Sequence, residues 1–172
     1  MIKYLSARRA SQLTIFLLAI GVLSSCNSYQ TNSISHTTTV SGEMLFEGAN
    51  TLQGAVSDLS ASLQDQGIAT HDIKSAKLTG IEFEIQAEDS EIIESLLFQV
   101  VSDQSSLKSL GSLSPLPEGS KVSLNLAEET EIVEYLRDEG ATWVLDLNID
   151  EDHMDEMIVS CTIQMEITTL EN

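Results

Sequence analysis

Basic and aromatic side chains are scarce in this 172-residue sequence. It carries 8 Lys and Arg against 27 Asp and Glu, which gives a net charge of −19. A surface this acidic repels the phosphate backbone and excludes nucleic acid as a partner. One Trp, three Tyr and four Phe leave little for stacking on bases or sugars. An apolar content of 42% still favours a folded chain, and the length favours one domain.

The spacings that mark common catalytic sites are also missing. The sequence has no Gly-x-Ser-x-Gly, no His-Glu-x-x-His and no phosphate-binding loop, and its three histidines, His36, His71 and His153, lie far apart. Glu82 and Glu84 could form an acid–base pair, but no aromatic platform accompanies them, so a solvated strand face is the better interpretation. We therefore expect no enzymatic activity, no catalytic residues and no cofactor.

Cysteine is nearly absent as well, with Cys26 and Cys161 as the two occurrences. Cys161 could be a nucleophile, but it alternates with Val159 and Ile163 on one face of an expected strand, which favours a small core residue. Trp143 opens another alternating segment and is expected to pack in the core rather than to stack on a ligand.

No apolar run is long enough to cross a bilayer. The longest, residues 13–23, covers ~16 Å as a helix, against the ~30 Å of a bilayer's hydrocarbon. It follows the basic residues Lys3, Arg8 and Arg9, and this order of charge and apolar run is typical of a secretion signal.

Leu23-Ser24-Ser25-Cys26 directly follow that run and resemble the lipobox of bacterial lipoproteins. The resemblance implies cleavage between Ser25 and Cys26, removal of residues 1–25, and acylation of Cys26, including palmitate, as a membrane anchor. Loss of three basic residues would take the net charge from −19 to −22. By the same resemblance, Asn27 favours the outer membrane, and the lack of an acidic cluster just after Cys26 favours its periplasmic face, with the cell surface as the other option. A cleaved but unlipidated signal is the alternative.

Residues 26–39 are expected to hold the lipidated cysteine and a flexible tether, because residues 27–39 are polar and lack apolar periodicity. His36, within this segment, has no neighbours that suggest a metal site. The remaining residues, 40–172, are expected to form one domain.

Alternation of apolar and polar residues predicts strands at 81–88, 143–150 and 159–168. The last two flank an acidic stretch and are expected to pair as an antiparallel hairpin. Weaker patterns predict further strands at 40–47, 96–101, 107–113 and 121–126. Helical spacing predicts two helices, one capped by Asn50 that ends at Gly67 and one over residues 127–138.

These elements predict a mainly β fold, an antiparallel sandwich of about seven strands with two short helices. The segment Ile73–Gly80 before an alternating strand and the turn Ser114–Gly119 before the next one are similar to small β-sandwich domains of uncharacterised envelope lipoproteins. The resemblance implies a fold and no activity.

Together, the patterns favour a lipid-anchored envelope protein that acts as a non-catalytic binding or structural accessory, with another envelope protein as its partner. A cation- or carbohydrate-binding module is the alternative. A hydrolase is a third hypothesis, and it would need a pocket that holds a histidine or paired carboxylates. The acidic run 150–156 offers Asp150, Asp152 and Asp155 as candidate calcium ligands, yet it lacks the glycine that the known calcium loop needs for its sharp turn. We therefore expect no specific metal site.

Overall fold

The computed structural model describes residues 28–128 and 130–170, which form nine β-strands and three short α-helices. The strands are β1 (Tyr29–Gly42), β2 (Gly48–Ala55), β3 (Ile73–Glu84), β4 (Ile93–Val101), β5 (Lys108–Leu113), β6 (Lys121–Ser123), β7 (Asn125–Leu126), β8 (Thr142–Ile149) and β9 (Met157–Leu170). The helices are α2 (Ser57–Asp65), α3 (Ala87–Ile92) and α4 (Val133–Leu136), with one 3₁₀ turn, η1 (Thr70–Asp72). Within these residues, no helix is long and apolar enough to span a membrane.

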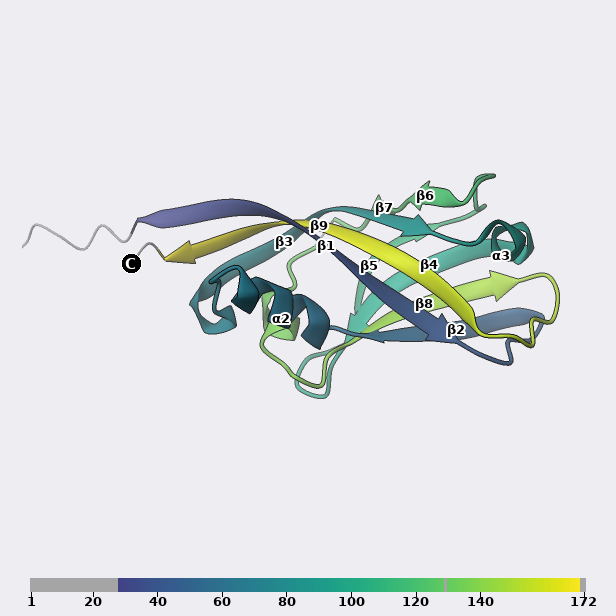
Figure 1. Ribbon diagram of the computed structural model, residues 1–172, viewed down its shortest axis with the longest axis horizontal. Coiled ribbons are helices and arrows are strands. Elements are labelled where there is room, and N and C mark those ends of the chain that lie inside the picture. Colours follow the sequence, from purple (N-terminus) through teal and green to yellow (C-terminus); the bar gives the residue numbers. More distant parts are fainter. Residues whose placement is uncertain (1–27, 129, 171–172) are drawn as a thin grey trace, which may run out of the picture.

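The strands form one antiparallel sheet that folds over on itself. Their order is β6-β3-β9-β1-β2-β8-β4-β5-β7. Between β1 and β2 a single residue pair, Ser41 with Gln53, holds the sheet together, so the chain turns there into a second layer (Figure 1). The predicted mainly β, antiparallel sandwich is confirmed, with nine strands instead of about seven.

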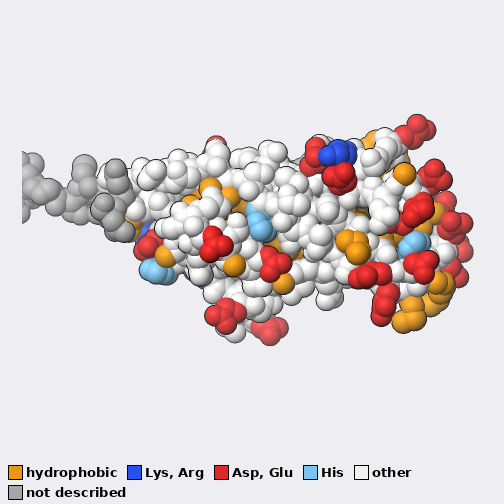
Figure 2. All heavy atoms as spheres, viewed as in Figure 1, with side chains coloured by type: hydrophobic (Ala, Val, Ile, Leu, Met, Phe, Trp, Pro, Cys, Tyr) orange, Lys and Arg blue, Asp and Glu red, His pale blue; other side chains and the backbone are white. Residues whose placement is uncertain are grey.

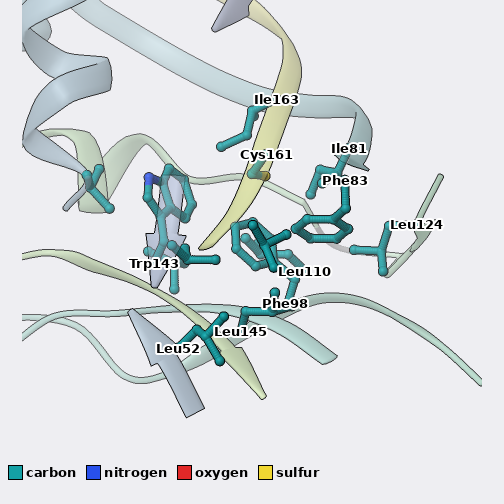
Figure 3. Packing of buried hydrophobic residues seen from close by; sticks show 14 of the residues in the cluster. Leu52, Ile81, Phe83, Phe98, Leu110, Leu124, Trp143, Leu145, Cys161 and Ile163 are labelled. Carbon is teal, nitrogen blue, oxygen red and sulfur yellow. The ribbon is translucent and has the colours of Figure 1, made fainter. Parts of the chain in front are cut away.

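Inward side chains of the two layers meet in one core (Figure 3). Phe83 of β3 packs edge-on against Phe98 of β4 across the layers, with ring centroids 5.3 Å apart. Phe98 in turn stacks on Trp143 of β8 at 5.5 Å. Trp143 and Cys161 are both fully buried, which confirms the prediction that they are core residues.

The expected flexible tether is instead most of strand β1. This strand pairs with β9 along its whole length, from Tyr29 opposite Leu170 to Gly42 opposite Met157. The prediction of a tether over residues 27–39 is therefore wrong for residues 29–39, and the domain starts earlier than residue 40. Ser and Thr are compatible with a half-exposed strand. Because they occupy both inward and outward positions of β1, the sequence shows no alternation of apolar and polar residues there.

Strands β8 and β9 do not form the predicted hairpin. β8 pairs with β2 and β4 in one layer, whereas β9 pairs with β1 and β3 in the other. The acidic stretch between them therefore crosses from layer to layer. Alternation predicted correctly which side chains point inward, but it carries no information about which strand lies alongside.

The first predicted helix is partly wrong. Residues 50–55 belong to β2, and the helix α2 begins only at Ser57. Leu52 and Val56 are both buried and lie four residues apart, a spacing that a strand followed by a helix also produces. The side chain of Asn50 caps no helix; it accepts a hydrogen bond from the Phe46 N–H and donates one to the Phe46 carbonyl, at 3.0 and 2.6 Å.

The second predicted helix is much shorter than residues 127–138, because its first part bonds to β3 instead. The Thr130 hydroxyl donates to the Leu78 carbonyl at 3.1 Å, and the Ala76 N–H donates to Glu131 Oε1 at 2.6 Å. Only α4 remains helical, and the short helix α3 was not predicted.

Cys161 provides a test of the core. Burial raises the pKa of its thiol well above the usual value. In a Cys26→Ser background, where Cys161 is the only thiol, we expect no reaction with a thiol reagent until the protein is denatured. Cys161→Ala should cost about 1 kcal/mol of unfolding free energy, and Cys161→Asp far more, because it buries a charge. Rapid labelling of the native protein would show that the faces of β9 are reversed.

His36 provides a test of β1. Its Nε2 is buried without a hydrogen-bond partner, and desolvation lowers its pKa, against the opposing attraction of Asp58. Protonation is therefore easier in the unfolded chain, so the stability present above pH ~6.5 is lost as the pH falls below it. We expect the melting temperature to drop less between pH 7.5 and 5.5 for His36→Gln than for the wild type. His71→Gln, a change at a largely exposed side chain, should match the wild type; equal slopes for all three would contradict the assignment.

Candidate functional site

Three segments meet at one end of the sandwich, far from Tyr29. A strand of the length of β1 spans about 43 Å, so the residues after Gly42 lie about that far from Tyr29, the first residue of β1. We call residues 43–47, 86–92 and 150–156 the distal end. Figure 1 shows these connections gathered at one end of the molecule, and Figure 2 shows acidic side chains concentrated there.

Backbone hydrogen bonds hold the segments of the distal end together. The Leu45 N–H donates to the His153 carbonyl at 2.8 Å, and the His153 N–H donates to the Leu45 carbonyl at 2.9 Å. Asp152 Oδ1 accepts from the Glu47 N–H at 2.9 Å. The Asp150 N–H donates to the carbonyl of Ile92, the last residue of α3, at 3.0 Å. The loops are therefore fixed relative to one another.

A cleft of about 340 Å³ lies between α3 and the β8–β9 loop. Five carboxylates and one histidine line it, and no Lys or Arg does: Glu88, Asp89, Glu151, His153, Asp155 and Glu156. Ionised carboxylates only accept hydrogen bonds, so a cleft with this lining favours a ligand that donates them and carries positive charge.

Asp89 is the buried acid of this cleft, with 4% of its surface exposed. Its Oδ1 lies 3.7 Å from His153 Nε2. Burial raises the pKa of Asp89; attraction by His153 opposes the shift, and repulsion by Glu88 adds to it. The carboxylate is therefore ionised at a cost to the fold, and a cationic group in the cleft would offset that cost.

The three candidate calcium ligands have separate places in the structure. Asp150 is exposed, Asp152 accepts the hydrogen bond from Glu47, and Asp155 lines the cleft. Across residues 28–128 and 130–170, no group of three or more His, Cys, Asp or Glu side chains is arranged to hold a metal ion.

Other residues singled out in the sequence lie away from the distal end or outside the described part. Glu84 forms an exposed ion pair with Lys121 at 3.2 Å, and Glu82 is exposed beside it. His71 is exposed, 3.5 Å from Asp72. Ser25 and Cys26, the predicted cleavage and lipidation residues, lie outside the described residues.

A second cleft, of about 530 Å³, lies toward the opposite end of the molecule. Its lining comes from the start of β1, the residues after α2 and the end of β9, and includes Gln30, Asn32, Gln66 and Asp72. These groups are mostly neutral and no aromatic side chain lines the cleft, so it offers no platform for a sugar ring.

Asp89 and the pairing of Leu45 with His153 were not predicted from the sequence. Asp89 sits in the polar segment between two apolar runs, where an acid normally faces water. Its burial results from the β8–β9 loop, more than sixty residues later, folding over α3. No local pattern signals such a contact.

No model of a known protein family matches the chain, and no curated protein matches it. Solved structures give distant likenesses. The Desmodium yellow mottle tymovirus structure is 12% identical, with a TM-score of 0.35 over 88% of this chain and 95% of that one. The decameric BFDV capsid protein is 11% identical, with a TM-score of 0.34 over 81% and 99%. A Yersinia pseudotuberculosis-derived mitogen is 6% identical, with a TM-score of 0.27 over 85% and 88%. These scores are too low to support an argument about function.

Asp89 yields a prediction about pH. Because its pKa is raised in the folded protein, the stability present at low pH is lost as the pH rises through that pKa. Asp89→Asn removes the charge but keeps the shape. We expect its melting temperature relative to the wild type to increase between pH 3.5 and pH 7. Glu91→Gln, a change at an exposed acid on the same helix, should show no such trend. A relative melting temperature of Asp89→Asn that falls over this range would refute the assignment.

Proposed function

We propose that this chain is a lipid-anchored protein of the bacterial cell envelope whose β-sandwich acts as a non-catalytic binding or structural accessory. The observation that carries the proposal is Leu23-Ser24-Ser25-Cys26, placed directly after a basic start and a short apolar run. Acyl chains on Cys26 would hold the protein in the membrane, and several chains on one cysteine hold far more stably than one. Asn27 favours the outer membrane, with the domain facing the periplasm.

The position of β1 supports a close connection between anchor and domain. The strand begins at Tyr29, three residues after Cys26, and three extended residues reach about 10 Å. The anchored end of the sandwich would therefore lie near the lipid headgroups. The distal end would project outward by about the 43 Å length of β1.

The groups at the distal end suit the binding of a cationic partner, and they also meet the requirement of a hydrolase for a pocket that holds a histidine and carboxylates. The cleft contains carboxylates and one histidine, while the thiol of Cys161 is buried in the core. The alternative of a module that binds a metal cation has less support, because Asp150, Asp152 and Asp155 lie in separate places and do not converge. A carbohydrate-binding module has less support too, because neither cleft has an aromatic side chain in its lining.

The anchor can be tested by removing the acceptor of the lipid. Cys26→Ser should abolish acylation, seen as loss of the lipid mass on the N-terminal peptide, and should move the protein out of the detergent phase in a detergent partition. Cys161→Ala, which removes the other cysteine, should remain lipidated and membrane-bound. An unlipidated Cys26→Ser protein that still fractionates with the outer membrane like the wild type would overturn the lipoprotein assignment.

A further inference from the structure

Three large apolar side chains are exposed together at the distal end. Met44 and Phe46 are 60% and 58% exposed, and Met154 is 55% exposed. Met44 and Phe46 flank Leu45, and Met154 follows His153, the residue that exchanges two backbone hydrogen bonds with Leu45. We call these three side chains the distal patch. Figure 2 shows exposed hydrophobic groups next to carboxylates at this end.

The distal patch is held on an ordered backbone. Asn50 bonds both the N–H and the carbonyl of Phe46, at 3.0 and 2.6 Å, and Leu45 between Met44 and Phe46 is buried. Side chains on a fixed backbone lose less conformational entropy when they bind. Exposed apolar groups rimmed by polar residues mark interaction surfaces, and Met and Phe are enriched there.

The loops that carry the patch are strongly acidic. The two loops that carry it, residues 43–47 and 150–156, contain no Lys or Arg, and their acids are Glu43, Glu47, Asp150, Glu151, Asp152, Asp155 and Glu156. The acidic cleft shares the β8–β9 loop with the patch, because His153 lines the cleft and Met154 belongs to the patch. Charge complementarity therefore selects a partner that combines apolar side chains with positive charge.

We propose that the distal patch and the acidic cleft on the same loop dock a segment of another envelope protein in which apolar side chains alternate with lysines or arginines. Its apolar side chains pack on Met44, Phe46 and Met154, and a basic side chain enters the cleft toward Asp89. This inference deepens the proposed function and rests on its non-catalytic binding role. The same carboxylates repel anionic headgroups, which argues against a membrane as the occupant.

Methionine methyl groups report directly on this surface. Met44 and Met154 belong to the patch, whereas Met157 and Met165 are buried in the core and serve as internal controls. The experiment uses the lipidated protein, ¹³C-labelled at its methionine methyls, in phosphatidylcholine nanodiscs. The probe is the capped peptide Lys-Leu-Lys-Leu-Lys. The control is the capped peptide Lys-Ser-Lys-Ser-Lys, which has the same charge but no apolar side chains. Empty nanodiscs measure how much peptide partitions into lipid.

We expect the Lys-Leu peptide to shift the Met44 and Met154 signals in a saturable way and to leave those of Met157 and Met165 unchanged. The Lys-Ser peptide should bind at least tenfold more weakly. Equal binding of the two peptides, or shifts of all four signals alike, would overturn the proposal. Two further results would overturn it. If the Met44 and Met154 signals shift with protein concentration alone, the surface binds a second copy of the chain. If these methyl groups show contacts with acyl chains, the surface binds the membrane.

Matched variants separate the patch from general hydrophobicity and charge. Phe46→Ser should weaken binding of the Lys-Leu peptide at least tenfold, whereas Leu107→Ser, a change at an equally exposed leucine outside the distal end, should not. Neutralising Glu151, Asp155 and Glu156 to Gln, Asn and Gln should weaken binding at least threefold. Neutralising the exposed acids Asp65, Glu82 and Glu139 in the same way should have a smaller effect.

Unchanged Met157 and Met165 signals verify that each variant is folded. Equal effects of a distal variant and its control would refute the docking surface. The anchor is tested independently of peptide binding, by measuring the lipid mass on Cys26. A lipidated protein that fails to bind the Lys-Leu peptide therefore overturns the docking surface alone, whereas an unlipidated wild-type protein overturns the proposed function.

Discussion

The burial of one face of β9 is the constraint on which the rest of the structure depends. Its inward side chains are all buried: Met157, Val159, Cys161, Ile163, Met165 and Ile167. β1 and β3 occupy its two edges, so a slip by one residue would turn this whole row toward water. The register with β1 places Gly42 opposite Met157. That pairing brings the β1–β2 loop beside the β8–β9 loop and thereby creates the distal end.

Alternation in the sequence predicted the sandwich, the buried Cys161 and the buried Trp143, because in these strands the apolar residues repeat every second position. Alternation failed to predict strands where β-bulges or inward polar residues interrupt the period of two. In β3, register shifts after Ile73 and after Leu78 break the period of two, so only the part from Ile81 was recognisable. In β1, polar residues such as Thr38 take inward positions and conceal the period. The β8–β9 hairpin failed because alternation predicts faces and not neighbours.

The candidate site was predictable in composition and not in arrangement. The acidic run 150–156 is evident in the sequence, but carboxylates that are close along the chain need not point to one place in the fold. Asp152, for example, accepts a hydrogen bond from the backbone N–H of Glu47 in another loop. Asp89 and Phe46 belong to segments with no pattern that connects them to that run. Only the crossing between layers brings them together, since it carries the β8–β9 loop over α3 and against the β1–β2 loop.

The continuity of β1 has a mechanical consequence. The chain that leads into Tyr29 and the loop that carries Phe46 are the two ends of the same strand. Tension applied between them runs along covalent bonds and pulls no hydrogen-bonded pair apart. Tension that reaches the β8–β9 loop passes instead into β9 and across fourteen residue pairs with β1, which it loads in shear all at once rather than one after another. A domain built this way transmits a pull along its long axis without opening its core.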